Sequence, residues 1–372
     1  MRRLNEDSEN AMKALILPRY DCLAASTRLR FIQYFPWLEK AEIQTYVFPF
    51  FSNDYVYNLQ FRKKKITSIL TSYLKRLRDL LNAHHFDFIL IHIELLPWLP
   101  AWVELYFLSR QVCYVLDYDD AFFHRYDQHR SALVRKILGS KHDELIRRAV
   151  LVIAGNEYIA KKALTAGAKR VEIVPTVIDL NRYPPPDEKR IELDRKLRIG
   201  WIGQCATVPH LLMLKNLMVL MAQEHKVIFS AIGIDAAKFD LPMQSVRWTE
   251  ETEVEEISRF DIGIMPLPDT PFERGKCGYK LIQYMACGLP VIASPVGANC
   301  KIVEHGVNGF LAETEQEWRD ALLILISDPE LRYRMGLAGR QKIEKHYSIQ
   351  VTGPKMATLL SSLVTKEHNI LI

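Results

Sequence analysis

Residues 269–294 read DTPFERGKCGYKLIQYMACGLPVIAS, and this stretch decides the fold. A loop that contains glycines leads into an amphipathic helix, in which Leu281, Ile282 and Met285 form the apolar side. The chain then turns at Gly288-Leu289-Pro290 into the apolar run PVIAS, which has the length of a buried strand. A helix followed by a short buried strand predicts one βα unit of a parallel sheet.

The same pattern extends in both directions along the chain. Short apolar runs alternate with longer amphipathic stretches, which predicts an α/β fold with two doubly wound, Rossmann-like parallel sheets. The expected strands are 13–18, 44–50, 86–93, 112–117, 150–155 and 170–175 in the first half, and 197–203, 226–233, 245–249, 261–267, 290–294 and 309–312 in the second. In the first half, helices are expected over 28–40, 60–83 and 130–149.

A run of three prolines, Pro184-Pro185-Pro186, predicts the boundary between the two sheets. Consecutive prolines neither continue a helix nor occupy a central strand, so they predict a stiff extended connector. We expect four parts: a flexible extension at 1–12, a first domain at 13–183, a second at 184–350, and a terminal helix within 351–372 that returns to the first. Two such domains face each other across a cleft, and ligands of such sheets bind at the carboxyl ends of the strands.

Composition limits the class of protein. The chain has 372 residues, of which 49% are apolar, 25% charged and 10% aromatic, and this excludes a disordered or fibrous protein. Residues 1–186 contain 27 Lys and Arg against 20 Asp and Glu, whereas residues 187–372 contain 22 against 24. An anionic partner is therefore expected to bind the first half.

The location of the protein is predicted from its cysteines and apolar runs. The six cysteines are scattered and contain no CxxC pair, which is typical of a reducing compartment. The opening residues resemble no secretion signal. The most apolar stretch, 86–116, is interrupted by charged residues and prolines, and a spanning helix needs about 20 nearly uninterrupted apolar residues. We expect a cytoplasmic protein.

The loop and helix start around residue 278 have the features of a phosphate site. Glycines let the backbone approach a ligand closely, and a helix N-terminus offers N–H groups and a positive dipole end. The spacing i, i+4 and i+7 predicts one polar face that contains Lys276, Lys280 and Gln283. Together with Arg274, the lysines can offset the charge of a diphosphate without a metal ion. An exposed basic helix start, with glycines that serve only the turn, explains the same residues.

The segment resembles the signature of the family 4 glycosyltransferases. The resemblance is carried by residues 284–294, YMACGLPVIAS, with support from NGFLA at 308–312, GWIG at 200–203, GNEYIAKKA at 155–163 and VPTVIDLNRY at 174–183. It covers nearly the whole chain from Lys13 onward. It implies the GT-B fold, retention of anomeric configuration, and a nucleotide-diphosphate sugar as co-substrate, with no other cofactor.

The sequence departs from the family's pattern in its charged residues. Gly275 and Gln283 stand where the family has two glutamates that hold the donor sugar and the ribose. Residues 204–210, QCATVPH, match the stretch that carries the family's phosphate-binding Arg and Lys, and they contain no firm cation. The resemblance therefore implies that other residues bind the donor. The expected donor-binding residues are Gly203, Thr207, Glu273, Arg274, Lys276, Gly278, Lys280 and Gln283.

Three carboxylates in four residues, Asp117, Asp119 and Asp120, end a strand of the first domain. Such a cluster needs a cationic or hydroxyl-rich partner. We expect Asp117 and Asp120 to be catalytic or to orient the acceptor, in a loop where many family members carry a histidine. Helix capping and a metal-binding DxD remain as alternatives, and we expect no metal because the donor motif lies in the second half.

Three further residues of the first half are expected to bind the acceptor. Arg28 follows the first strand and can reach an acidic group, although a surface salt bridge explains it equally well. Glu94 ends the strand FDFILIHI, and His124 follows the acidic cluster.

The stretch Phe48–Arg78 interleaves aromatic residues with Arg62-Lys63-Lys64-Lys65, Lys75, Arg76 and Arg78. This combination is typical of a protein that binds the surface of an anionic membrane. No nucleic-acid-binding motif accompanies it, so we expect no nucleic-acid partner. A solvated helix face is the alternative.

The sequence as a whole predicts a metal-independent retaining glycosyltransferase, which moves a sugar from a nucleotide-diphosphate donor to a glycan or lipid-linked acceptor. Retention demands little of the protein if an oxygen of the leaving diphosphate deprotonates the acceptor. A non-catalytic GT-B subunit of a glycan-assembly complex is the alternative from another class. A nucleotide-sugar epimerase is the third.

Overall fold

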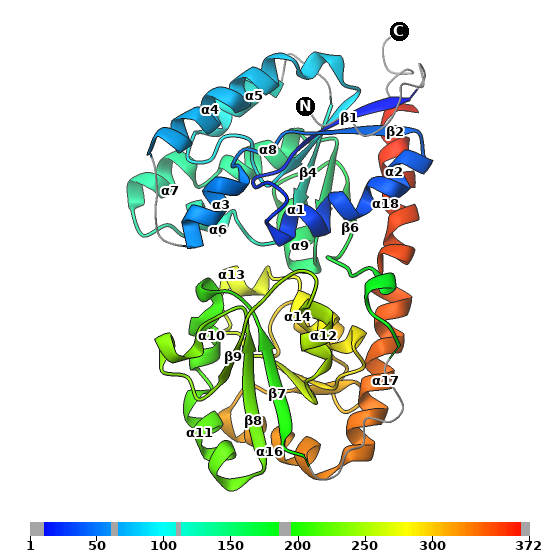
Figure 1. Ribbon diagram of the computed structural model, residues 1–372. Coiled ribbons are helices and arrows are strands. Elements are labelled where there is room, and N and C mark those ends of the chain that lie inside the picture. The colour runs from blue at the N-terminus through cyan, green and yellow to red at the C-terminus, as the bar shows by residue number, and fades with distance from the viewer. Residues whose placement is uncertain (1–10, 61–65, 109–112, 186–194, 366–372) are drawn as a thin grey trace. The chain divides into compact units, whose positions relative to one another are not determined.

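The structure is a computed structural model that describes residues 11–60, 66–108, 113–185 and 195–365 (Figure 1). It divides into two compact units. Unit 1 comprises Met1–Thr176 and Thr352–Ile372, and unit 2 comprises Val177–Val351. The division falls at Val177, before the expected boundary at 183, because Ile178 forms a parallel bridge with Ser348 of unit 2.

Unit 1 is built on a six-stranded parallel sheet of order β2-β1-β3-β4-β5-β6. Its strands are β1 (Met12–Leu17), β2 (Ile43–Val47), β3 (Phe88–His92), β4 (Tyr114–Tyr118), β5 (Leu151–Ala154) and β6 (Val171–Ile173). Strands β3, β4 and β5 are buried along their whole length. Strands buried on both faces are apolar in sequence, which is why these runs could be recognised.

Helices cover both faces of this sheet. They are α1 (Ala25–Arg30), α2 (Phe35–Lys40), α3 (Asn53–Gln60), α4 (Ile66–Leu81), α5 (Ala101–Leu108), α6 (His124–Asp127), α7 (Ala132–Leu138), α8 (Lys141–Arg148), α9 (Glu157–Thr165) and α18 (Ile349–Thr365). Helices α4, α5, α8 and α9 pack with Leu116 and Tyr118 of β4 in one apolar core. Because side chains alternate along a strand, Asp117 points to the opposite face, where it contacts α1.

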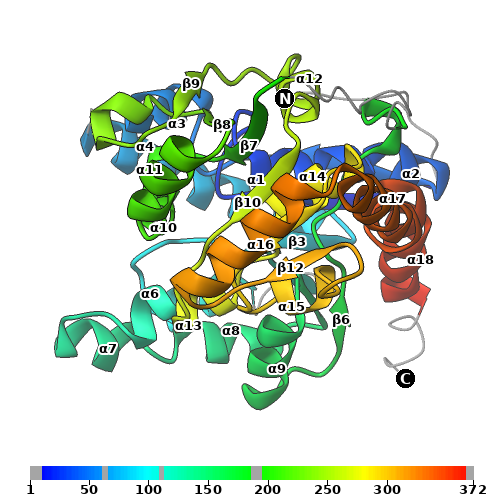
Figure 2. The ribbon, with the colours of Figure 1, turned by 90° about the horizontal axis from the view of Figure 1, so that it is seen from below.

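The part of α18 from Thr352 onward packs beside α2, and both views show the two helices together (Figures 1 and 2). The hydroxyl groups of Tyr34 and Thr352 lie 3.1 Å apart. A Cβ atom at Gly353 would come within 2.5 Å of the Trp37 ring, so the small residue permits this close contact.

Unit 2 contains a second six-stranded parallel sheet, of order β12-β11-β10-β7-β8-β9. The strands are β7 (Leu197–Ile202), β8 (Val227–Ile232), β9 (Gln244–Val246), β10 (Ile262–Met265), β11 (Val291–Ala293) and β12 (Gly309–Leu311). The predicted fold class of two Rossmann-like parallel sheets is thus confirmed. The prolines Pro184 and Pro185 lie within unit 2, before β7, and do not join the two units.

The helices of unit 2 also form two layers. They are α10 (Val208–Leu212), α11 (Lys215–Glu224), α12 (Glu253–Ser258), α13 (Pro271–Arg274), α14 (Tyr279–Ala286), α15 (Asn299–Ile302), α16 (Glu315–Ser327) and α17 (Pro329–His346). Helices α10, α11 and α16 pack on one face, and α12 and α14 on the other. The Tyr284 hydroxyl of α14 accepts a hydrogen bond from the backbone N–H of Ile202 at the end of β7 (2.9 Å). This contact fixes α14 at the carboxyl end of the central strand.

Candidate functional site

The candidate donor site lies at the carboxyl ends of β7 and β10 in unit 2. After β7 the chain turns at Gly203, whose N–H donates to the carbonyl of Ile232 (3.0 Å). A Cβ atom at Gly203 would lie 2.3 Å from the Trp201 ring, so only glycine fits there without displacing that ring. The sequence predicted Gly203 as a donor-binding residue, and this role stays a prediction.

The loop after Gly203 is closed by Thr207, another predicted donor residue. The hydroxyl of the half-buried Thr207 donates to the carbonyl of Gln204 (3.0 Å) and accepts from its N–H (3.4 Å). The bond from the Gln204 N–H, together with the Gln204 side chain that accepts from the Thr207 N–H, forms a capping box for the short 3-10 helix Cys205–Thr207. The loop is therefore held in shape by its own side chains.

Gly278 directly precedes α14 and adopts a left-handed conformation with φ of +65°. A Cβ atom there would come within 2.3 Å of the end of the Ile302 side chain. Both facts favour glycine, because other residues rarely adopt this conformation. The positive dipole end of α14 lies directly after it.

Two lysines and a histidine gather beside this helix start, and we name His210, Glu273, Lys276 and Lys280 the unit 2 cluster. The Nε2 atom of His210 lies 3.3 Å from Oε1 of Glu273. The Lys280 ammonium lies 5.4 Å from the ring centroid of Trp201. The Lys276 ammonium lies 5.0 Å from the ring centroid of Phe272.

The pKa of His210 is lowered by its surroundings in this cluster. Burial is the largest cause, and the nearby Lys276 and Lys280 lower the pKa further, whereas Glu273 raises it. His210 is therefore held neutral near pH 7. An added diphosphate would be attracted by both lysines and by the start of α14.

Two predicted donor residues have other contacts. Arg274 is exposed and forms a bidentate pair with Asp269, at 2.6 and 2.8 Å. Gln283 is 3% exposed, and its Nε2 donates to the hydroxyl of the buried Tyr183 (3.2 Å). The expectation of one polar face with Lys276, Lys280 and Gln283 was wrong, because α14 begins at Tyr279 and Lys276 precedes it.

In unit 1, Asp117 is part of a buried ion pair. Its two carboxylate oxygens accept from Nε and Nη2 of Arg30, at 2.9 and 2.6 Å, and both side chains are at most 1% exposed. Arg30 also donates from Nη1 to the carbonyl of Val174 (2.8 Å). This geometry favours a structural role for Asp117 over the predicted catalytic one.

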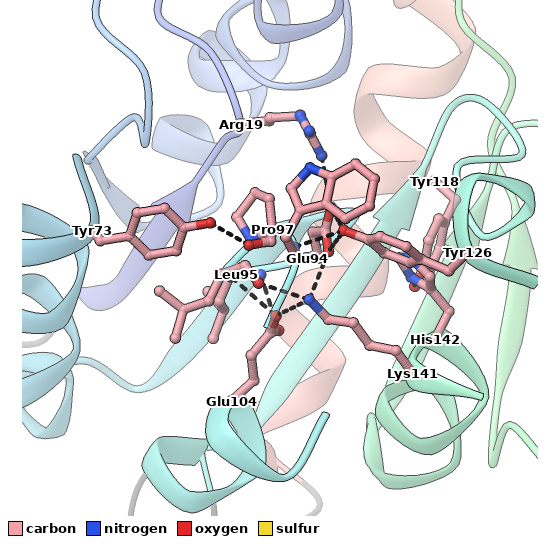
Figure 3. Close-up of polar contacts among 12 residues, drawn as sticks. Arg19, Tyr73, Glu94, Leu95, Pro97, Glu104, Tyr118, Tyr126, Lys141 and His142 are labelled. Carbon is pink, nitrogen blue, oxygen red and sulfur yellow. Dashed lines mark hydrogen bonds and ion pairs between the residues drawn. The ribbon is translucent and has the colours of Figure 1, made fainter. Parts of the chain in front are cut away.

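Glu94 lies in a buried polar network rather than at an open edge (Figure 3). It accepts from Arg19 Nη1 (2.7 Å), Lys141 Nζ (2.7 Å) and the Tyr126 hydroxyl (3.0 Å). Lys141 also contacts Glu104 at 2.7 Å. Although burial raises it, the pKa of Glu94 is lowered to about 2, mainly by Lys141, with His142 and Arg19 contributing.

The other predicted acceptor residues are also engaged locally. The Arg28 guanidinium donates to the carbonyls of Cys22 and Leu23, both at 2.9 Å, and so closes the loop before its own helix. His124 contacts the carboxylate of Asp127 and the hydroxyl of Tyr158, each at 2.8 Å.

Asp119 and Asp120 complete the acidic cluster at the end of β4. Asp119 lies 3.0 Å from Nε2 of the buried His92. The pKa of Asp119 is lowered, because the contacts with His92 outweigh the effect of burial. Asp120 is partly buried and directly follows it. The structure thus brings Asp119, Asp120 and His92 together at the carboxyl edge of unit 1.

Several residues escaped the sequence reasoning, among them His210, Arg19 and Lys141. His210 was recognised only as the end of a stretch without a firm cation, although it contacts Glu273. Arg19 directly follows the Pro18 that ends the first apolar run, and this position after a strand was its only signal. Lys141 gave no signal, since nothing in the sequence distinguishes a buried lysine from an exposed one.

Within the described residues, no three His, Cys, Asp or Glu side chains are grouped as the ligands of a metal ion would be. In the same residues no single helix has the length and apolar character needed to cross a bilayer, and one bent pair, Cys205–Leu212 with Lys215–Glu224, meets these criteria only jointly.

Residues 196–328, which contain the whole unit 2 cluster, match the family described as Glycosyl transferases group 1. This match lies within unit 2 alone, and the two Rossmann-like sheets of the chain have the GT-B fold of the solved structures described below.

The chain is similar to a curated protein of Bacillus subtilis (strain 168), which is named as the teichuronic acid biosynthesis glycosyltransferase TuaH. The two are 25% identical over 185 residues, which cover 45% of this chain and 46% of that protein. The chain thus spans about half the length of this relative. Solved structures with a similar fold include HepE of Anabaena in complex with UDP and glucose, with a TM-score of 0.71 and 17% identity over 95% of this chain and 100% of that one. Sucrose-phosphate synthase of Thermosynechococcus elongatus gives a TM-score of 0.72 and 14% identity over 95% and 99%.

Proposed function

We propose that this chain is a glycosyltransferase that takes a sugar from a nucleotide-diphosphate donor bound in unit 2. The observation that carries the proposal is the position of Lys276 and Lys280 at the start of α14, beside the Gly203 loop and inside the matched segment. Helix starts with neighbouring cations bind phosphate groups well. The solved HepE complex with UDP and glucose has a similar fold and supports the same ligand class.

The reaction that we propose is retaining and independent of metal. A hydroxyl oxygen of the acceptor forms the new bond to the anomeric carbon as the bond from that carbon to the diphosphate oxygen breaks. The hydroxyl proton passes to the leaving diphosphate on the same face of the sugar. Lys276, Lys280 and the start of α14 stabilise the charge that develops on this leaving group.

Calorimetric titration with UDP, GDP and uridine tests the donor site. Replacing Lys280 by Ala should weaken the diphosphate about tenfold or more, because a charge-assisted contact is lost, and should leave uridine unchanged. Lys345→Ala, at an exposed lysine near the end of α17, is the matched control and should change neither. Equal losses for UDP and uridine in Lys280→Ala would refute the role of this lysine.

The engaged Arg274 and Gln283 favour one alternative, a non-catalytic subunit of a glycan-assembly complex. Product analysis with a nucleotide sugar separates the possibilities. Transfer to an added glycan or lipid-linked acceptor supports the proposal, whereas a changed sugar on an intact nucleotide indicates the epimerase. Nucleotide binding without any turnover across a panel of donors and acceptors indicates the scaffold.

We also propose that unit 1 binds an anionic membrane surface at the inner face of the cytoplasmic membrane, but through other residues than the sequence predicted. Phe50 and Phe51 are 3% and 7% exposed and belong to the core, and Arg62–Lys65 lie outside the described residues. An exposed apolar row on α4 has the required character instead. It consists of Ile66, Leu70 and Leu74, which are 75%, 59% and 68% exposed.

Basic and aromatic residues accompany this row. Lys75 and Arg78 are exposed on α4 itself. Trp102 of α5, whose neighbours pack against the same core as α4, is 70% exposed. Apolar side chains inserted at the interface and cations above it are the features of monotopic binding.

Co-sedimentation with vesicles tests this surface. The intact chain should bind vesicles that contain phosphatidylglycerol and bind pure phosphatidylcholine vesicles weakly. The double variant Leu70→Glu, Leu74→Glu should reduce vesicle binding at least tenfold. Each leucine that inserts into the membrane contributes about 1.5–3 kcal/mol to binding. Leu164→Glu on α9, at a leucine that is 62% exposed, is the control. An equal loss in the control would show that the α4 row is not the contact.

A further inference from the structure

Two arginines from separate parts of unit 1 meet at one aromatic ring. The guanidinium carbon of Arg19 lies 5.5 Å from the centroid of the Phe122 ring, and that of Arg125 lies 4.7 Å from it. Arg19 follows β1 and Phe122 follows β4, and these strands flank β3 in the sheet. Both arginines are therefore placed at the carboxyl edge of the sheet, where α/β folds bind ligands.

Arg19 is buried, at 5% exposure, and its bonds are incomplete. Its Nη1 donates to Glu94, while its Nε has no hydrogen-bond partner among the described residues. Buried polar groups in proteins are nearly always bonded, so an unpaired donor on a buried guanidinium indicates a missing acceptor. This observation points to a ligand independently of the charge around it.

The carboxylate that pairs with Arg19 is shared with a second cation. Figure 3 shows that Arg19 and Lys141 reach Glu94 from opposite sides, so one carboxylate serves two cations. Lys141 is saturated by its further contacts with Glu104 and the carbonyl of Leu96. Arg125 is exposed and forms no ion pair within the described part of the chain. Partial desolvation and the nearby charge of Arg19 lower the pKa of Arg125.

An aromatic stack borders the same position. The rings of Phe51 and Tyr55 are parallel within 8° at a centroid distance of 3.9 Å, and Tyr20 stacks on Phe51 at 5.7 Å. The Arg19 guanidinium lies 5.8 Å from the Tyr20 ring. Aromatic faces beside cations provide a surface for a sugar ring that carries an acidic group.

We propose that the acceptor is an anionic sugar, whose phosphate or carboxylate group is bound by Arg19 and Arg125 at the carboxyl edge of unit 1. This inference rests on the proposed function and names its acceptor class. The anion accepts from the unpaired Nε of Arg19 and from the fork of Arg125, and the sugar ring lies against the aromatic stack. A neutral sugar leaves Nε of Arg19 without its acceptor and therefore binds more weakly.

Binding of three matched sugars tests the inference: methyl glucoside, glucuronate and glucose 6-phosphate. NMR titrations are recorded at low ionic strength with saturating UDP, so that the unit 2 cluster is occupied. The intact chain should bind one or both charged sugars at least tenfold more tightly than methyl glucoside. The glucuronate and phosphate arms distinguish a uronic acid from a sugar phosphate. Equal affinity for all three sugars overturns the inference.

Arg125→Ala should remove most of this preference and leave UDP binding unchanged, because the residue is exposed and lies in unit 1. Arg130→Ala, at an exposed arginine in the same loop region, should retain the preference. Equal losses in the two variants show a general charge effect and overturn the site. Arg19→Lys keeps the charge but lacks the guanidinium Nε–H donor. Its preference for the charged sugars should fall, while its circular dichroism spectrum should match that of the intact chain. Failure of the intact chain to bind UDP would instead refute the donor proposal, and this is measured first on the same samples.

Discussion

Replacing Asp117 by Asn separates the structural role of this residue from the catalytic role that the sequence predicted. The substitution preserves shape but removes the charge opposite Arg30, whose side chain is fully buried. It also places an NH2 donor where one carboxylate oxygen now accepts, at 2.6 or 2.9 Å. The contact of Arg30 with the carbonyl of Val174 is neutral and cannot replace the lost charge.

The expected cost follows from this geometry. Removing one partner of a buried pair leaves an uncompensated charge and lowers the free energy of unfolding by about 3–5 kcal/mol. With a urea dependence of about 2–3 kcal/mol per molar, the unfolding midpoint of unit 1 should fall by roughly 1–2.5 M. Urea unfolding of the intact chain measures this, with hydrogen exchange of β4 peptides to assign the transition to unit 1.

Two variants complete the experiment. Glu172→Gln disrupts a pair with Arg170 in the same unit that is about one-third exposed, and it should cost under about 1 kcal/mol. Arg30→Met combined with Asp117→Leu should recover most of the loss, because a well-packed apolar pair replaces the charges. Unchanged stability of Asp117→Asn with lost transferase activity would refute the structural role and restore the catalytic one.

Two further predictions concern stability. Burial lowers the pKa of His142 to about 4, below its ordinary value of 6.5, so protonation of this residue favours the unfolded chain. Unit 1 should therefore lose about 3 kcal/mol of stability as the pH falls from 6.5 to 4. In urea titrations, His142→Asn should flatten this pH dependence, and the same flattening in the exposed His84→Asn would contradict the assignment. Gly278→Ala should lower the thermal midpoint of unit 2 more than Gly306→Ala does. Both glycines have positive φ, but only a Cβ atom at residue 278 would also collide with the Ile302 side chain. Equal shifts of the two midpoints in calorimetry would mean that Ile302 moves away without cost.

The fold could be predicted because its signal is local. Buried parallel strands such as β3 and β7 appear as short apolar runs, and the amphipathic helices between them have a different period. The glycine at 278 was also recognised, because a turn beside a helix start limits the residue types that fit. The boundary between the units was misplaced because the bridge between Ile178 and Ser348 joins residues far apart in the sequence.

The polar sites could be predicted only in part, because their partners are distant along the chain. Arg30 lies 87 residues before Asp117, and Tyr183 lies 100 residues before Gln283. A sequence presents such residues as free charges or amides, and an acidic residue at the end of a strand is equally typical of a site and of a buried pair. The roles that the sequence could not decide were those of side chains whose hydrogen bonds depend on the tertiary fold.

The number of bonds that a buried polar group can still form therefore separates structure from function in this protein. Asp117 has both oxygens bound to the buried Arg30, and Lys141 uses all three of its donors on two carboxylates and a carbonyl, so both side chains are held within the protein. Arg19 is equally buried but retains an unpaired Nε beside the exposed Arg125. An unpaired buried donor lowers the stability of the folded protein. A bound ligand that supplies the acceptor restores the lost hydrogen bond. The network around Glu94 thus holds Arg19 in place, and Arg19 itself is the member that can bind an anion.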